Sequence, residues 1–260
     1  MRLFDAHNHF QDAKFDNNRN HIISECEEVG LVQMVTNGTN ETDWEKVAAL
    51  AKNYKQIIPS FGLHPWFITD RSPNWLKSLE NQLNNSPRAV GEIGLDRYKN
   101  KGLYKEQEEV FLCQLKLSTE RNLPVSIHCI KAWEQLYNLL RDNQLPERGF
   151  LLHGFAGPEE IIEPLTKLGA YFSFPGSFAS NKKIKQRNKF CKIPIDRILV
   201  ETDAPYQTIP LNLISHALEN NLNHPANIKN TYKTAAETIG IDLNEFANLV
   251  EDNFLRIFGS

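Results

Sequence analysis

The sequence predicts an α/β fold, a (β/α)8 TIM-type barrel that forms one domain over residues 1–260. Eight short β-rich runs recur along the chain, and segments with helical periodicity lie between most of them. The first run begins at residue 2 and the eighth at residue 198, so the mean spacing is about 28 residues, the size of one strand–helix unit. With 260 residues, 41% of them hydrophobic, the chain can bury the core of a single barrel.

The expected strands are runs of four to six residues. In chain order they are Arg2–Ala6, Leu31–Thr36, Ile57–Gly62, Arg88–Ile93, Pro124–Ile127, Gly149–Leu152, Ala170–Phe174 and Ile198–Glu201. Helical periodicity is clearest in Thr42–Tyr54 and Lys105–Arg121. Near the C-terminus, Asp242 stands three residues before Glu245, which is typical of a helix start. The apolar residues that follow keep helical spacing: Phe246, Leu249, Val250, Phe254 and Ile257.

An open, doubly wound sheet is the alternative architecture. Such a sheet normally carries a glycine-rich turn after its first strand. Here the first strand runs into the segment AHNHF at residues 6–10, without a GxGxxG pattern. No linker rich in proline, glycine or serine divides the chain, so the barrel is favoured.

The charge balance argues against one class of function. The chain has 29 basic and 32 acidic side chains, for a net charge of −3. Proteins that coat nucleic acid through bulk charge are usually strongly basic, so only a local grip on a few phosphates is compatible with this composition. No apolar run approaches the roughly 18 residues that a membrane span needs, and no membrane partner is expected.

The N-terminal segment and the cysteines predict the compartment. Met1–Phe10 reaches histidine and acidic residues at once, without the apolar core of a signal peptide. The four cysteines lie far apart, with no CxxC pair and no zinc-finger spacing. We therefore expect reduced thiols in a cytoplasmic protein that is a monomer or a weak oligomer.

Five of the eight histidines fall at or just after the ends of expected strands, and two carboxylates share this position. These residues are His7, His9, His64, Glu92, His128, His153 and Asp203. The carboxyl ends of the strands meet at the face of a barrel that carries the active site, so the side chains are expected to converge. Successive strand residues point to opposite faces, so His7 and His9 project the same way, as do Glu201 and Asp203.

The mixture of imidazoles and carboxylates predicts a site for two divalent metal ions. Imidazole suits zinc, whereas carboxylates suit magnesium or manganese and can bridge two cations. One such histidine alone is typical of a satisfied core residue, but seven residues at strand ends are not. Neighbouring cations can hold the attacking and departing oxygens of a phosphodiester while a nearby carboxylate takes a proton from water. Several acids, Asp5 among them, are expected to face cations rather than water.

Six short motifs follow this strand pattern in order. They are DAHNH at residues 5–9, GLHP at 62–65, GEIGLD at 91–96, IH at 127–128, HGF at 153–155 and ETDAP at 201–205. Together they resemble the TatD family of metal-dependent deoxyribonucleases, over nearly the whole chain. The resemblance implies hydrolysis of phosphodiester bonds in DNA, often as a 3′–5′ exonuclease. The ligands that it implies are His7, His9 and Asp203 for one metal, His128 and His153 for a second, and Glu92 as the bridge.

The resemblance also implies other roles. Asp203 would be the general base on the attacking water, His64 would contact the scissile phosphate, and Glu201 would contact the substrate or support a ligand. The sequence departs from the family after His128, where similar proteins commonly carry arginine and then an acid. This chain has Ile130 and Lys131 there. His224 is a second departure, because the family more often has an acidic or small polar residue at that place.

A second enzyme class keeps the barrel and the metals. Amidohydrolase-type relatives cleave a C–N or C–O bond in a small metabolite, and a small phosphoester is a further possible substrate. Many of these enzymes use a carboxylated lysine as the bridge at the fourth strand, whereas this chain has Glu92 there. That difference favours phosphoesters. A barrel that binds without catalysis would require the loss of a ligand or the base, and every one is present.

Two further features bear on a DNA substrate, either a single strand or a frayed end. Six basic residues fall within eleven positions after the seventh strand: Lys182, Lys183, Lys185, Arg187, Lys189 and Lys192. Such a run is typical of a solvated helix face, and the alternative is a surface that binds backbone phosphates. Four aromatic residues follow strand ends and could stack on a base or serve packing: Trp66, Phe174, Phe178 and Tyr206.

Overall fold

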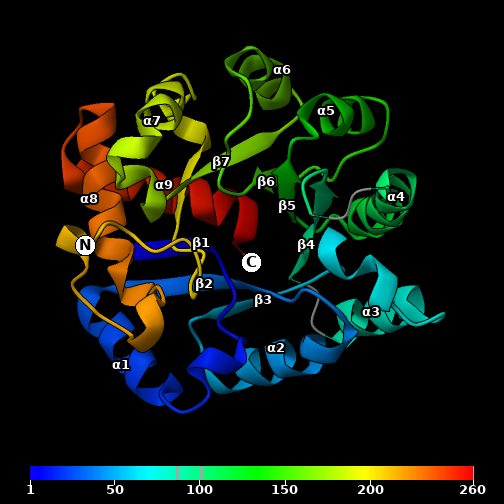
Figure 1. Ribbon diagram of the computed structural model, residues 1–260, viewed down its shortest axis with the longest axis horizontal. Helices are drawn as coiled ribbons and strands as arrows, with labels where there is room; N and C mark the ends of the chain where they lie inside the picture. The colour runs from blue at the N-terminus through cyan, green and yellow to red at the C-terminus, as the bar shows by residue number, and fades with distance from the viewer. Residues whose placement is uncertain (86–87, 100–101, 260) are drawn as a thin grey trace.

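The computed structural model describes residues 1–85, 88–99 and 102–259. Its eight strands pair in parallel as one sheet in the order β1 to β8, and helices surround them (Figure 1). The predicted (β/α)8 barrel is confirmed. The strands are β1 (Leu3–Asn8), β2 (Leu31–Asn37), β3 (Ile57–Phe61), β4 (Ala89–Asp96), β5 (Val125–Ile130), β6 (Phe150–Leu152), β7 (Ala170–Pro175) and β8 (Ile198–Glu201).

The helices follow the strands in alternation. They are α1 (Arg19–Val29), α2 (Glu41–Asn53), α3 (Trp75–Asn85), α4 (Tyr104–Arg121), α5 (Trp133–Arg141), α6 (Ile162–Lys167), α7 (Ile184–Phe190), α8 (Ile228–Ile239) and α9 (Leu243–Phe258). The three predicted helical segments are confirmed as α2, α4 and α9. Asp242 is the N-cap of α9, because its carboxylate accepts hydrogen bonds from the backbone N–H groups of Asn244 and Glu245 at 2.8 and 3.2 Å. Across the described ranges, no helix combines the length and the apolar character needed to cross a membrane.

Strands β4 and β5 run three residues further than predicted. Their ladder continues from Gly94 opposite His128 to Asp96 opposite Ile130. Glu92 and His128 therefore lie within strands, not near or at strand ends as predicted. Gly94 permits this close pairing: its φ is +147°, and a Cβ there would lie 2.0 Å from the His128 carbonyl oxygen.

The barrel closes between its last and first strands. The N–H of Asp203, just after β8, donates to the carbonyl of His7 at 2.9 Å. The N–H of His9, just after β1, donates to the carbonyl of Ala204 at 2.8 Å. These two bonds bring residues from opposite ends of the chain to the same rim of the barrel.

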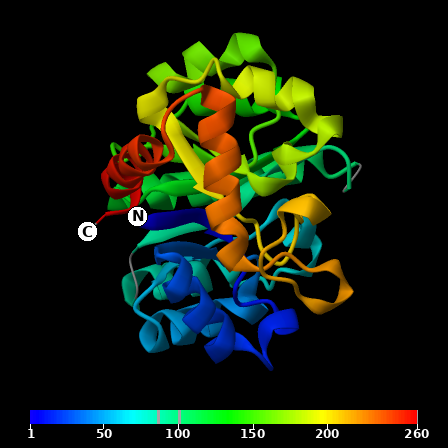
Figure 2. The same cartoon turned by 90° about the vertical axis from the view of Figure 1, so that its left-hand side faces the viewer.

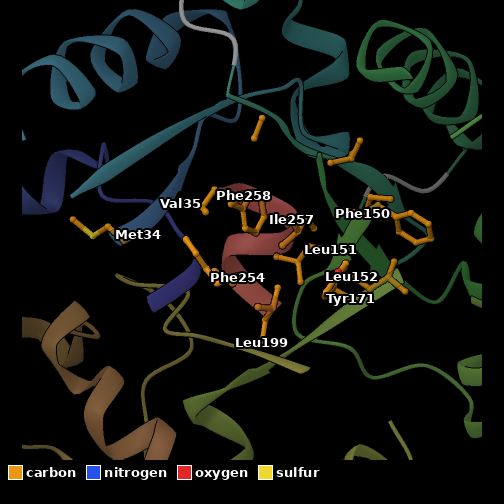
Figure 3. Close-up of a cluster of buried hydrophobic side chains, with 14 of the residues drawn as sticks. Met34, Val35, Phe150, Leu151, Leu152, Tyr171, Leu199, Phe254, Ile257 and Phe258 are labelled. Carbon is orange, nitrogen blue, oxygen red and sulfur yellow. The ribbon is translucent and has the colours of Figure 1, made fainter. Parts of the chain in front are cut away.

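Helix α9 covers the other end of the barrel. The Phe254 ring lies 4.8 Å from the ring of Phe4 near the start of β1, and Asn253 Nδ2 donates to the carbonyl of Ile198, the first residue of β8, at 2.8 Å. In Figure 3, side chains of α9 lie among strand residues such as Val35 and Leu151. Figure 2 shows α9 beside the N-terminus, with the orange segment between β8 and α8 on the opposite side. The core therefore fills the barrel beneath the rim where the histidines gather.

We predict that Phe254→Ala destabilises the protein by about 3–5 kcal/mol, because its ring is fully buried and its removal leaves a cavity. Leu255→Ala is the matched control, since the Leu255 side chain on the same helix is 43% exposed and is expected to cost about 0.5 kcal/mol or less. Urea unfolding followed by circular dichroism measures both. Equal midpoints for the two variants would contradict this role for α9.

Candidate metal centre

The carboxylate of Glu92 is the point at which the predicted site residues meet. Glu92 lies on β4 and is only 2% exposed. Its Oε2 faces the two histidines at the end of β1, and its Oε1 faces the three others. The nitrogen-to-oxygen distances are His7 Nε2 3.5 Å, His9 Nε2 3.2 Å, His64 Nε2 3.3 Å, His128 Nδ1 3.1 Å and His153 Nε2 2.9 Å. The structure therefore brings these five histidines and Glu92 together, as the sequence predicts.

Asp203 approaches the same histidines from the turn after β8. Its backbone has a left-handed φ of +53°, and its Oδ1 lies 3.8 Å from His7 Nε2 and 3.6 Å from His9 Nε2. Its Oδ2 accepts a hydrogen bond from Gln207 Nε2 at 2.9 Å. One carboxylate oxygen is thus fixed by an amide and the other faces the imidazoles.

The second ring nitrogens of His7 and His9 have oxygen partners. His9 Nδ1 donates to the carbonyl of Asn37 on β2 at 2.9 Å, and His7 Nδ1 lies 2.8 Å from Ser126 Oγ on β5. For His9, a proton on Nδ1 leaves Nε2 as a lone-pair donor, the arrangement found in metal-binding histidines. His7 Nδ1 also lies 3.1 Å from the side-chain amide nitrogen of Asn37. His7 Nε2 is buried without a hydrogen-bond partner among the described residues, so it fits a metal ligand.

His128 and His153 are held in a similar way. His128 Nε2 lies 3.1 Å from Asp96 Oδ2, which leaves Nδ1 facing Glu92. His153 Nδ1 lies 3.6 Å from Glu201 Oε1, and the Glu201 carboxylate accepts a hydrogen bond from Ser173 on β7. Glu201 is fully buried behind His153. The position fits support of that imidazole, one of the two predicted roles.

His64 differs from the other four histidines. Its Nδ1 accepts a hydrogen bond from the backbone N–H of Trp66 at 3.1 Å, so the ring proton resides on Nε2. That N–H points to Glu92 Oε1. In this tautomer His64 is a hydrogen-bond donor at the centre of the site and is not a lone-pair donor.

Three overlapping groups of side chains place their ligand atoms within 4.8 Å of one another. They are His7, His9 and Glu92; His7, His153 and Asp203; and His64, Glu92 and His128. Shared members connect the groups into one continuous cluster. Because His153 groups with His7 and Asp203, and Glu92 belongs to two of the groups, the grouping alone does not assign each residue to one of two cations. Imidazole and carboxylate together suit zinc or manganese, and the residues fit divalent metal ions.

Electrostatics holds the cluster together. Burial alone raises the pKa of Glu92, but the surrounding imidazoles, His64 and His153 first, lower that pKa well below its usual value. Burial lowers the pKa of His9, whereas Glu92 and Asp203 raise it, and the pKa is about 9. Positive charge on His9 and negative charge on Glu92 and Asp203 therefore stabilise each other where water is excluded, whereas burial lowers the pKa of His64 to about 4 and favours its neutral form.

The support behind the ligands includes residues without a predicted role. Asn37 ends β2, Ser126 precedes His128 by two residues on the same face of β5, and Asp96 ends β4. Each is a polar residue in a buried strand. Polarity at the ends of buried strands, combined with side-chain alternation, was the signal that could have found them.

Asp5 does not face a cation site as expected. Its carboxylate is fully buried and accepts hydrogen bonds from Thr202 N at 2.9 Å, from Thr202 Oγ1 at 2.5 Å and from Asn8 Nδ2 at 3.1 Å. Burial raises the pKa of Asp5 to about 7 against the effect of these bonds. The residue ties β1 to the turn that carries Asp203.

Two of the four aromatic residues that follow predicted strand ends serve packing in the core. The rings of Phe174 and Phe178 are buried and lie 5.5 Å apart, and the Phe174 ring lies 5.1 Å from that of Phe190 on α7. Trp66 and Tyr206 are 36% and 47% exposed, at the rim. Among the six basic residues after β7, Arg187 has a structural role. Its guanidinium donates hydrogen bonds to the carbonyls of Phe178 and Ala179.

At the two departures from the family pattern, the side chains of Lys131 and His224 contact other residues. The ammonium of Lys131 lies 4.9 Å from the centre of the Tyr98 ring. His224 is buried and lies 3.0 Å from Glu25 on α1. Both positions therefore have contacts outside the cluster.

Comparisons with known proteins agree with this geometry. The chain is 29% identical over 261 residues to the metal-dependent hydrolase YabD of Bacillus subtilis, with 98% of each chain covered. It is 28% identical over 265 residues to the 3′–5′ ssDNA/RNA exonuclease TatD of Escherichia coli, with 99% of each covered. A solved structure of YjjV, a TatD homologue of E. coli, superposes with a TM-score of 0.91 at 27% identity, covering 100% of this chain and 98% of the other. The family described as TatD related DNase matches residues 4–259, and the chain belongs to this family of metal-dependent hydrolases.

Proposed function

We propose that the protein is a divalent-metal-dependent phosphodiesterase that acts on DNA, as a 3′–5′ exonuclease on single strands or frayed ends. The observation that carries the proposal is the buried Glu92 carboxylate, which faces five imidazoles. Four of those rings have oxygen atoms beside their other nitrogen, as metal ligands do. The exonuclease name of the E. coli relative supports the substrate class.

Two divalent cations, Zn²⁺, Mg²⁺ or Mn²⁺, would bind at this cluster. When bound, they supply positive charge for the phosphate and lower the pKa of water. The proposed ligands are His7, His9 and Asp203 for one cation, His128 and His153 for the other, and Glu92 between them.

The remaining roles fall to individual atoms of the chain. Asp203 accepts the proton of the attacking water, since Gln207 fixes its Oδ2 and its Oδ1 faces the histidines. His64 donates its Nε2–H to an oxygen of the scissile phosphate, since its Nδ1 is occupied by the Trp66 N–H. Glu201 acts through His153 as a positioning residue.

We also propose that the barrel acts in the cytoplasm, as one domain and as a monomer or weak oligomer. All four cysteines are free, and Cys113 and Cys191 are exposed to solvent. Exposed free thiols are compatible with a reducing compartment.

We predict that Glu92→Ala and Asp203→Asn impair the enzyme in different ways. Glu92→Ala removes the carboxylate that faces all five imidazoles of the cluster, so bound metal and nuclease activity are both lost. Asp203→Asn removes the general base and weakens one proposed ligand, so it lowers kcat by about 100-fold or more and reduces the affinity for one cation without removing the shared carboxylate of Glu92. Metal quantification and cleavage of a labelled single-stranded oligonucleotide measure the two effects.

Glu163→Gln is the control for these variants, because Glu163 is exposed and pairs only with Lys167 among the described residues. Nuclease activity that survives both site substitutions would contradict the site assignment. A wild-type enzyme that is loaded with metal, cleaves no oligonucleotide and hydrolyses an amide or a small phosphoester would support the alternative enzyme class.

We predict that His64→Gln and His128→Gln separate substrate contact from metal binding. His64→Gln leaves the metal content unchanged and lowers kcat by about 100-fold, because a donor to the phosphate is lost. His128→Gln lowers metal affinity, because a ligand is lost. Metal content after dialysis and steady-state kinetics with the same oligonucleotide measure both, and loss of metal from His64→Gln would show that His64 is a ligand.

A further inference from the structure

Trp66 is an exposed aromatic residue that is fixed beside the metal cluster. Its ring centre lies 4.9 Å from the ring of His64 and 5.9 Å from that of His128. The indole Nε1–H donates to Asp96 Oδ2 at 2.6 Å, the same oxygen that His128 contacts. The ammonium of Lys99 lies 3.8 Å from the ring centre. One aromatic ring, one carboxylate and one lysine therefore form a unit at the rim.

Tyr206 forms a second unit of the same construction from other parts of the chain. Its ring centre lies 5.9 Å from the ring of His9. The hydroxyl donates to Asp12 Oδ2 at 2.7 Å, and the ammonium of Lys14 lies 4.4 Å from the ring centre. Again a carboxylate fixes the ring and a lysine lies over it.

The two units flank different parts of the cluster. His9, beside Tyr206, faces Glu92 Oε2, whereas His64, beside Trp66, faces Glu92 Oε1. The two exposed rings therefore lie beside histidines that face different oxygens of the Glu92 carboxylate.

We propose that these units are two nucleotide subsites, one on each side of the scissile phosphate, that select single-stranded DNA. The inference rests on the proposed function. Trp66 and Tyr206 stack on the bases of two successive nucleotides, and Lys99 and Lys14 pair with the neighbouring phosphates. Every base has an aromatic face, so the subsites accept any sequence.

Paired bases cannot use these rings. In a duplex each base is stacked and hydrogen-bonded inside the helix, and its removal breaks those interactions. A single strand or a frayed end has no such cost. The carboxylates of Asp96 and Asp12 hold the rings before the substrate arrives, so little side-chain freedom is lost on binding. The lysine stems are flexible, so each ammonium can leave its ring for a phosphate.

The test compares two single-stranded oligonucleotides of equal length, one of them with tetrahydrofuran abasic residues at its two 3′-terminal positions. For the wild type, KM for the abasic strand should be about tenfold or more above that for the complete strand. Trp66→Ala and Tyr206→Ala should each raise KM for the complete strand by about tenfold, with less change in kcat, and should change KM for the abasic strand by less than about twofold.

Trp66→Phe and Tyr206→Phe keep an aromatic ring but lose the hydrogen bond to Asp96 or Asp12, so each should raise KM for the complete strand by less than the corresponding alanine variant does. Tyr98→Ala is the matched control, since Tyr98 is a 63% exposed aromatic that also carries a lysine, Lys131, over its ring. Equal KM for the two strands in the wild type would overturn the subsites, whether or not any variant folds. If Trp66→Ala and Tyr206→Ala raised KM equally for the complete and the abasic strand, that result would also overturn the subsites. A wild type that cleaves neither strand would instead overturn the proposed function, and the subsites with it.

Discussion

A buried carboxylate that must be neutralised is the constraint on which the rest of this site depends. Glu92 is almost fully excluded from water, and an ionised carboxylate there is costly unless positive groups or hydrogen-bond donors surround it. Its partners come from β1, from β5 and from the turns after β3 and β6. These segments meet only when the barrel is closed, so closure of the fold and assembly of the site are one event.

Strands β2 and β7 carry no candidate ligand, but their side chains and carbonyl groups position ligands that other strands carry. Asn37 on β2 fixes His9, and Ser173 on β7 binds Glu201, which lies behind His153. Such support fixes the ring orientation and the tautomer of each imidazole. A metal centre of this kind therefore uses all eight strands, and its precision comes from hydrogen bonds made one layer away from the cation.

The sequence was sufficient for the features that repeat. Strand-length apolar runs and their spacing predicted all eight strands, and side-chain alternation predicted that His7 and His9 point together. It was insufficient where the chain leaves regular structure. It left open whether Phe174 and Phe178 stack on a base or serve packing, and the structure has both in the core, where Phe174 packs on Phe178 and on Phe190 of α7. The partners of Asp5 come from Asn8 and from Thr202, beyond β8, and strand alternation alone does not specify such contacts.

Helix α9 has a consequence for the order of folding. The core that begins with Phe4 on the first strand is completed by Phe254 on the last helix, and the two rings touch across nearly the full length of the chain. Contacts this distant in sequence form late and slow the folding of a domain, because the intervening chain must be ordered first. During synthesis the apolar end of the barrel stays uncovered until α9 has left the ribosome. During that interval the uncovered apolar surface is open to aggregation.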